Sequence, residues 1–237
     1  MNELNNPLRK IITLEDPVEI TLSGITQIPI NTNSGHTFAD GLRSVLRLDP
    51  DVVMVGEIRD VDTAKTAIQA SITGHLVLST FHAASAAAAF SRMVDMIGQN
   101  PIFANAIELI ISQRLVRHLD DATKRAYKPD EATKRWIRDV LRDLPQGYDM
   151  PDIDSVDLYL PGSSEDRPFG YDGRIMIMEE LVVNEAIQKY IRGEFTDINV
   201  SAIEKTAKEN GMMTMLQDGV LKVLRGETTL EEINRVL

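Results

Sequence analysis

The feature that most constrains the fold of this chain is a short apolar run, residues 52–55, enclosed between Pro50 and Gly56. Pro50 has no backbone N–H and disfavours helix in the residue before it, so the preceding segment should end there. The run is apolar on both faces, which is typical of a parallel strand covered on both sides. Glu57 and Arg59 follow at its carboxyl end, where open α/β sheets bind ligands. We interpret this segment as the acidic half of a nucleotide-hydrolysis site; from this segment alone, the alternative is an ordinary α/β core strand.

Composition excludes several other classes of protein. The chain has 237 residues, enough for one large or two small domains, and 43% of them are hydrophobic, which argues against a disordered chain. With 25 basic and 36 acidic residues the net charge is −11, so we expect no nucleic-acid partner. There is no cysteine, which excludes disulfides and thiolate zinc sites. No apolar run approaches bilayer length, so we expect a cytoplasmic protein, with attachment to the inner membrane through partners left open.

A second predicted strand, residues 11–14, also ends in acidic side chains. Glu15, Asp16 and Glu19 surround one turn after it. Three carboxylates at a turn could bind a hydrated magnesium ion or orient a water. The alternative is a solvated acidic turn. Residues 20–30 alternate weakly and favour a hairpin or edge strands.

A third strand, which we expect to be buried, covers residues 76–78 and is followed by His82, with His75 at its entrance. Seven residues across a strand are too far apart for the two histidines to share one metal, and His82 is better placed as a hydrogen-bond donor to phosphate. A lone histidine beside a strand is more often structural. Three successive strands with polar groups at the same edge nevertheless favour a shared site.

The helix expected after Thr37 has a capping-box pattern, with Asp40 in its first turn. Arg43 and Arg47 lie one turn apart on this helix. They are either solvated surface arginines or residues that reach phosphates across a subunit boundary.

The remaining elements are predicted from apolar periodicity. We expect helices over residues 62–72, 83–97, 101–116 and 131–144, and a strand over 174–178. The inward-facing residues are expected to be Phe103, Ile107, Ile110 and Ile111 in the third of these helices and Trp136, Val140 and Leu144 in the fourth. A further helix is lined by Met213, Leu216, Val220, Val223 and Leu224, and Thr228-x-x-Glu231 is expected to cap the last one.

These residues together resemble the ATPases of the type II secretion and type IV pilus assembly family, and the resemblance covers most of the chain. The segments that carry it are Ile12–Glu19 (similar to the Asp box), Asp49–Asp60 (Walker B), Thr73–His82 (His box), Gln113–Arg117, Gly170–Arg174 and Gly211-Met212.

The resemblance implies a RecA-like α/β fold with a small C-terminal helical subdomain. It implies a core over residues 1–117, an appended module over 118–172 and a C-terminal part over 173–237. It also implies a homo-hexameric ring, ATP and Mg²⁺ as ligands, and an inner-membrane platform protein as partner. The implied catalytic residues are Glu57, Glu15, Glu19, His82 and His75, and the implied nucleotide-binding residues are Asp16, Arg43, Arg47 and Arg59.

The chain departs from the family in two respects. Members usually bind zinc through two cysteine pairs, and the positions of these cysteines here hold Asp120, Thr123, Ser163 and Asp166. Carboxylates and hydroxyls are poor tetrahedral zinc ligands, so we expect no zinc.

The second departure concerns the phosphates. A nucleotide site of this kind needs a G-x-x-x-x-G-K-[ST] loop, and none of the fourteen glycines is followed by lysine. We therefore expect that the chain begins downstream of this loop and is inactive in isolation. The alternative is a non-catalytic remnant that serves as an interaction module.

Overall fold

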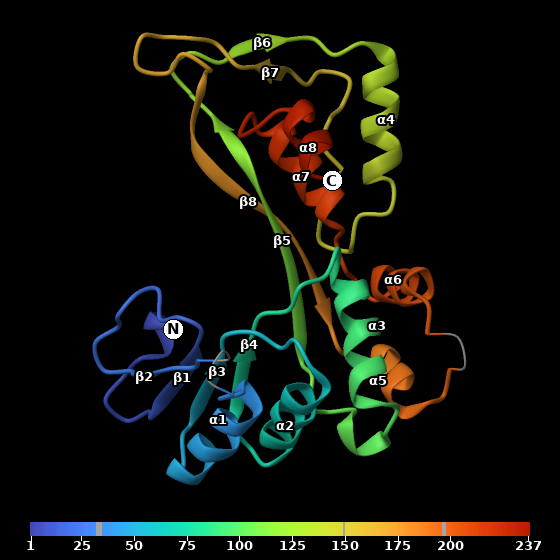
Figure 1. Ribbon diagram of the computed structural model, residues 1–237. Helices are drawn as coiled ribbons and strands as arrows, with labels where there is room; N and C mark the ends of the chain where they lie inside the picture. The colour runs from blue at the N-terminus through green and yellow to red at the C-terminus, as the bar shows by residue number, and fades with distance from the viewer. Residues whose placement is uncertain (32–34, 149, 196–197) are drawn as a thin grey trace. The chain divides into compact units, whose positions relative to one another are not determined.

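The computed structural model describes the whole chain except residues 32–34, 149 and 196–197. The chain divides into two compact units (Figure 1), and each is described by itself. The first unit contains residues 1–108 and 183–203, and the second contains residues 109–182 and 204–237. These ranges do not coincide with those expected from the sequence, because a strand continues across residue 117.

The first unit is organised around a parallel sheet with the strand order β2-β1-β3-β4. Its strands are β1 (Ile11–Glu15), β2 (Thr26–Pro29), β3 (Val52–Val55) and β4 (Leu76–Ser79). Leu14 pairs with Val55, and Val55 pairs in turn with Ser79, so the strands end level with one another. The three strands predicted from apolar runs are confirmed. Their carboxyl ends lie at one edge of the sheet, as the parallel order requires.

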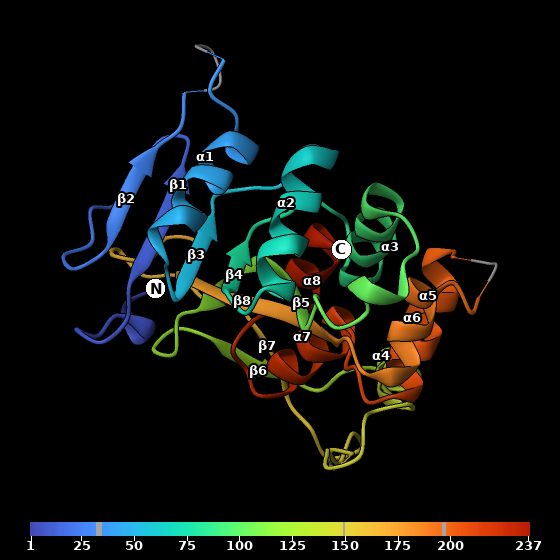
Figure 2. The ribbon, with the colours of Figure 1, turned by 90° about the horizontal axis from the view of Figure 1, so that it is seen from below.

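Two helices cover one face of this sheet (Figure 2): α1 (Phe38–Val45) and α2 (Val61–Ile72). Thr37 caps α1 by accepting a hydrogen bond from the amide of Asp40, as the sequence predicted. Asp60 caps α2 in the same way, through the amide of Thr63. Phe38 and Leu42 pack with the apolar side chains of β1 and β3 in one buried cluster. The short helix η3 (Leu46–Leu48) links α1 to β3.

The other regular elements among the described residues of the first unit are helices. They are η1 (Asn2–Leu4), α3 (Ala86–Ile97), η4 (Pro101–Phe103), α5 (Glu185–Arg192) and the start of α6 (Val200–Glu209). Phe90 of α3 meets Tyr190 of α5 edge to face, with 6.4 Å between ring centroids. Gln99 donates a hydrogen bond to the carbonyl of Tyr190 at 3.1 Å, which ties the end of α3 to α5.

Two predictions for this part of the chain are wrong. Strand β4 is not buried: Leu76 is 47% exposed, because β4 lies at the edge of the sheet and pairs, within the described residues, with β3 alone. The helix expected over residues 101–116 is absent. Only Pro101–Phe103 is helical there, and the chain then forms β5 (Leu109–Leu119). Ile111 is half exposed on this strand instead of facing inward.

The second unit is built on a long antiparallel ribbon of β5 and β8 (Tyr171–Val182). Its other elements are β6 (Arg125–Tyr127), α4 (Glu131–Leu141), β7 (Leu158–Leu160), α7 (Met215–Leu224) and α8 (Leu230–Val236). Val116 and Ile177 of the ribbon join side chains of α4, α7 and α8 in one core. Ile137 and Leu141 provide the buried face of α4, whereas Trp136 is 37% exposed, so the predicted stripe is displaced by one residue.

The helices of this unit are held by polar contacts at their ends. Gln217 completes a capping box with Thr214 and also donates to the carbonyl of Val140 at 3.2 Å, so that the start of α7 caps the end of α4. Thr229, not Thr228, caps α8 by accepting from the amide of Glu232.

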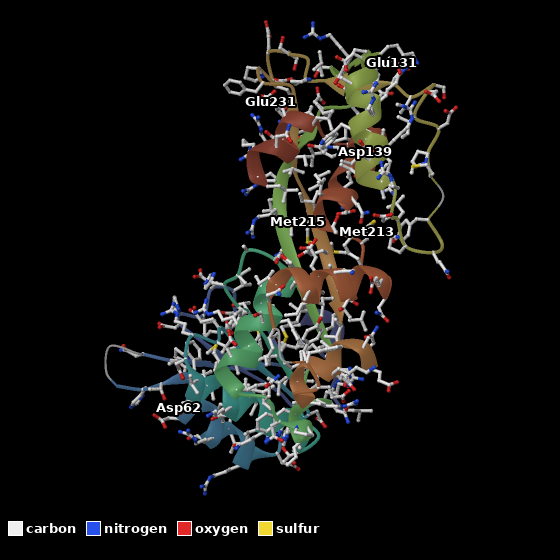
Figure 3. The ribbon with its side chains drawn as sticks, turned by 90° about the vertical axis from the view of Figure 1, so that its right-hand side faces the viewer. Asp62, Glu131, Asp139, Met213, Met215 and Glu231 are labelled. Atoms are coloured by element: carbon white, nitrogen blue, oxygen red, sulfur yellow. The ribbon has the colours of Figure 1, made fainter. Side chains whose placement is uncertain are left out.

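Met213 and Met215 lie at the start of α7 (Figure 3). No helix in the described part of the chain is long and apolar enough to cross a bilayer.

Candidate nucleotide-hydrolysis site

Glu57 lies just beyond β3, in a stretch of backbone bonded to both neighbouring strands. The amide of Gly56 donates to the carbonyl of Leu14 at 2.7 Å, and the hydroxyl of Thr80 donates to the carbonyl of Gly56 at 2.6 Å. On the other side of Glu57, the amide of Ile58 donates to the carbonyl of Thr80 at 3.0 Å. The position of Glu57 is therefore fixed from both directions.

Gly56 is needed at this point because the backbones approach closely. A Cβ atom on Gly56 would lie 3.0 Å from the carbonyl oxygen of Leu14 and 3.5 Å from the Cα of Glu15. Any side chain would push β1 away from the end of β3. The glycine that ends the strand thus also brings Glu57 close to the end of β1.

The carboxylate of Glu57 is the centre of a charged cluster. Its side chain is 14% exposed. The Nε of Arg59 donates to Glu57 Oε2, and the Nε2 of His82 lies 3.6 Å from the same oxygen. Hydrogen bonding to Glu57 and the charge of Glu57 raise the pKa of Arg59, and the charge of Asp16 adds to this effect. Residues that follow β1, β3 and β4 therefore come together, which was the central prediction from the sequence.

Glu15 joins this edge but is held by its neighbours. Its Oε1 accepts from Thr13 Oγ1 at 2.5 Å and from Gln27 Nε2 at 2.9 Å. Gln27 was not singled out in the sequence; the only available signal was its place in the weakly alternating segment, which becomes edge strand β2. Glu19 lies four residues beyond Glu15 and is exposed.

The described residues contain no group of three His, Asp or Glu side chains arranged to bind a metal ion. Glu57 is bonded to Arg59, and Glu15 is bonded to Thr13 and Gln27. Mg²⁺ commonly takes one or two carboxylates and completes its shell with water and substrate phosphates. The carboxylates of this edge fit such an ion only as partial ligands.

Three of the predicted site residues lie away from the cluster around Glu57. His75 stands at the amino end of β4, where its Nδ1 is 3.1 Å from the carbonyl oxygen of Ala70 at the end of α2. Arg43 pairs with Asp40 at 3.0 Å on the surface of α1, and Arg47 is exposed in η3. Within one chain the structure does not bring these three residues to Glu57. His75 and His82 lie at opposite ends of β4, and Arg43 and Arg47 lie in the last turn of α1 and in η3, beyond the first turn of the helix.

An open parallel α/β sheet with helices packed on it and acidic residues at its carboxyl edge defines the first unit as RecA-like. The solved structures agree with this fold. The chain superposes on the ADP-bound pilus retraction motor PilT with a TM-score of 0.62 and 26% identity, covering 97% of this chain and 52% of that one. The Legionella pneumophila ATPase DotB gives a TM-score of 0.61 at 22% identity, covering 96% of this chain and 51% of that one.

Residues 1–235 match the family model described as Type II/IV secretion system protein, and the chain belongs to this family. It is 42% identical over its whole length to type II secretion system protein E of Xanthomonas campestris pv. campestris, of which it covers 40%. It is 39% identical to the type IV pilus assembly ATPase PilB of Pseudomonas aeruginosa, again covering 40% of that protein. The chain thus spans about two fifths of the length of these two relatives.

Proposed function

We propose that this chain is the C-terminal part of a motor that couples ATP hydrolysis to type II secretion or type IV pilus assembly. The observation that carries the proposal is the 3.6 Å approach of His82 Nε2 to Glu57 Oε2 at the carboxyl edge of the sheet. A shielded carboxylate beside an exposed imidazole can serve a hydrolysis step in which a water must be oriented and a phosphate recognised. The family to which the chain belongs supports this reading.

Each residue of the edge has a role in this proposal. Glu57 orients the water that attacks the γ-phosphate. His82, whose side chain is 86% exposed, donates a hydrogen bond to that phosphate. Glu15 and Glu19 would shape the surroundings of a Mg²⁺ ion, and Asp16 and Arg59 would contact the nucleotide. The ion, when bound together with ATP, neutralises charge on the phosphates.

Arg43 and Arg47 keep a place in the proposal only through an assembly. In a homo-hexameric ring, these exposed arginines of α1 and η3 would face the nucleotide of a neighbouring chain. His75, at the amino end of β4, would help to shape the site of its own chain, as the family resemblance implies. The motor would lie in the cytoplasm and would deliver force to an inner-membrane platform protein. It would not act on a nucleic acid. The net charge of −11 supports the last point.

We infer that the 237 residues by themselves do not hydrolyse ATP at a meaningful rate. They contain no G-x-x-x-x-G-K-[ST] loop, whose amides and lysine supply most of the contacts to phosphate at such sites. The same fact favours the second candidate function, a non-catalytic interaction module. Glu57 and His82 still adjoin each other, which favours the first.

The test is the ATP turnover of the purified chain, with Glu57→Gln and the surface variant Glu131→Gln as a matched pair. We expect no turnover above background in all three proteins. Turnover that is lost in Glu57→Gln and kept in Glu131→Gln would overturn the inference of inactivity.

The two candidate functions are separated by the DNA ahead of the Met1 codon. If an in-frame G-x-x-x-x-G-K-[ST] is encoded there, the extended protein is expected to hydrolyse ATP and to lose this activity, but not ATP binding, in Glu57→Gln. A stop codon in that position would favour the interaction module.

A further inference from the structure

The second unit contains two turns at the positions where the family resemblance implies zinc. The first turn follows β5 and contains Asp120 and Thr123. The second lies in the segment 161–170, between β7 and β8, and contains Ser163 and Asp166. The side chains at these positions do not form a tetrahedral donor set. Thr123 Oγ1 donates to Asp120 Oδ2 at 2.6 Å, and Ser163 and Asp166 are exposed.

The two turns meet through their main chains. A Cβ atom on Gly162 would lie 1.9 Å from the carbonyl oxygen of Thr123, and a Cβ on Gly170 would lie 2.3 Å from the carbonyl oxygen of Gly162. Both distances are far below any tolerated contact, so only glycine fits at either position. The amide of Asp120 also donates to the carbonyl of Gly170 at 3.0 Å. Three stretches of backbone are thereby in direct contact.

Lys124 adds a polar link from the first turn to the C-terminal helices. Its side chain is only 19% exposed. The ammonium group donates to Asp121 Oδ1 at 2.5 Å and to the carbonyl of Gly226 at 2.9 Å, and it lies 4.8 Å from the ring centroid of Tyr159. These partners come from the turn itself, from β7 and from the segment between α7 and α8. One lysine therefore joins three parts of the unit.

Gly226 is shaped for this arrangement. Its φ is +72°, and a Cβ there would lie 2.8 Å from the ring of Tyr159 and 3.2 Å from Lys124 Nζ. A larger residue would force the ring or the ammonium group away. The contact between Lys124, Tyr159 and Gly226 is thus closely packed.

We propose that the module over residues 118–172 folds and persists without a metal ion, closed by the glycine contacts of Gly162 and Gly170 and by the Lys124 link. These contacts hold the two turns together where four thiolates and a zinc ion would otherwise do so. The inference concerns the architecture of the second unit and is independent of the proposed ATPase function.

The first test uses the purified 237-residue chain. Elemental analysis should find zinc well below one ion per chain, and the thermal midpoint should be the same with added zinc and with excess chelator. The chain should also refold from urea equally well in both conditions. One zinc ion per chain, or a midpoint or refolding yield that falls with the chelator, would overturn the proposal.

The second test compares Gly170→Ala with Gly173→Ala. Both glycines have positive φ, +68° and +74°, so both variants carry similar backbone strain, but nothing lies within 4 Å of a Cβ at Gly173. Only Gly170→Ala meets the backbone of Gly162. We expect its thermal midpoint to fall further than that of Gly173→Ala, by about 5 °C or more, or the module to fail to fold. Equal losses would refute the role of the backbone contact.

The lysine link is tested by Lys124→Met against Lys205→Met. Lys205 is 78% exposed, and its ion pair with Glu209 is long, at 3.9 Å. Lys124→Met should lower the thermal midpoint by about 3 °C or more, since three contacts of a shielded ammonium group are lost. Lys205→Met should not change it measurably. Equal midpoints for the two variants would refute the link.

Discussion

Glu232 provides the sharpest test of how the second unit is held together. Its side chain is fully buried in α8, and its carboxylate accepts four hydrogen bonds from two arginines. Arg117 donates its backbone amide at 2.9 Å and its Nη2 at 2.6 Å. Arg235 donates its Nε at 3.0 Å and its Nη2 at 2.8 Å. Arg117 in turn stacks over the ring of Tyr171, 4.1 Å from its centroid. Glu232 thus joins β5, α8 and, through Arg117, β8.

The magnitude follows from the pKa of Glu232. Burial on its own would raise this pKa, but the hydrogen bonds from Arg235 and Arg117 outweigh burial and lower it from 4.5 to about 2. A shift of this size corresponds to about 3 kcal/mol of extra stability for the ionised protein. The guanidinium groups are 41% and 52% exposed, so solvent screens part of the interaction. We expect Glu232→Gln to lower the free energy of unfolding by about 2 kcal/mol at pH 7.

The dependence on pH has a definite sign. Because the folded pKa lies below the unfolded value of 4.5, the stabilisation is fully present above pH 4.5. It is lost progressively as the pH falls from 4.5 towards 2. The difference between the natural chain and Glu232→Gln should therefore narrow over this range.

The measurement is urea unfolding followed by the fluorescence of Trp136, the only tryptophan of the chain, which reports on the second unit through α4. Glu131 is a control because its side chain is 75% exposed in the first turn of α4 (Figure 3), although its partner Lys134 is shielded, at 14%. Glu131→Gln should lower the free energy of unfolding by less than about 1 kcal/mol, clearly less than Glu232→Gln. Equal effects of the two substitutions at pH 7, or a difference that does not narrow below pH 4.5, would refute the reasoning.

Two further predictions concern single contacts. Gly56→Ala should destabilise the first unit by about 1–2 kcal/mol, since its Cβ would lie 3.0 Å from the carbonyl oxygen of Leu14; hydrogen exchange of the β1 and β3 amides would report this, and unchanged protection would contradict it. Thr229→Ala should remove the cap of α8 at a cost of about 1 kcal/mol and expose the amide of Glu232 to exchange. If that amide exchanged faster in Thr228→Ala and not in Thr229→Ala, Thr228 would be the cap, as the sequence pattern predicted, and the prediction would be wrong.

Local signals predicted the elements that position the site. The strands at residues 11–14, 52–55 and 76–78 are apolar runs ended by polar or glycine residues, and Thr37 caps its helix as its pattern indicates. Parallel order then places the residues that follow the strands at one edge, so the approach of Glu57 and His82 could be foreseen. The hydrogen-bond partners of the two carboxylates could not be foreseen, because the side chains of Arg59 and Gln27 meet Glu57 and Glu15 only in the folded chain.

The failures have a common physical cause. Residues 101–116 were expected to be helical because Phe103 and three isoleucines recur there at helical spacing, but from Leu109 the chain forms β5, which pairs with β8 about 60 positions later. β4 was expected to be buried because its residues are apolar, yet a strand at the edge of a sheet is covered less than its neighbours. Both outcomes depend on which strands pair over long distances in the sequence, and apolar periodicity within one segment does not report this pairing.

The amino-acid sequence by itself therefore determined the parallel core, the edge at which its acidic and imidazole groups gather and the family resemblance, since apolar runs, breakers and motifs are local properties. Only the tertiary structure decided which side chains bond to Glu57 and Glu15, and that Gly162, Gly170 and Lys124 close the turns of the second unit. Gln27 lies 12 positions from Glu15 and Gly226 lies 102 positions from Lys124, so these contacts depend on packing between separate segments. Arg59 is only two positions from Glu57, but the path of the folded backbone decides that their side chains meet.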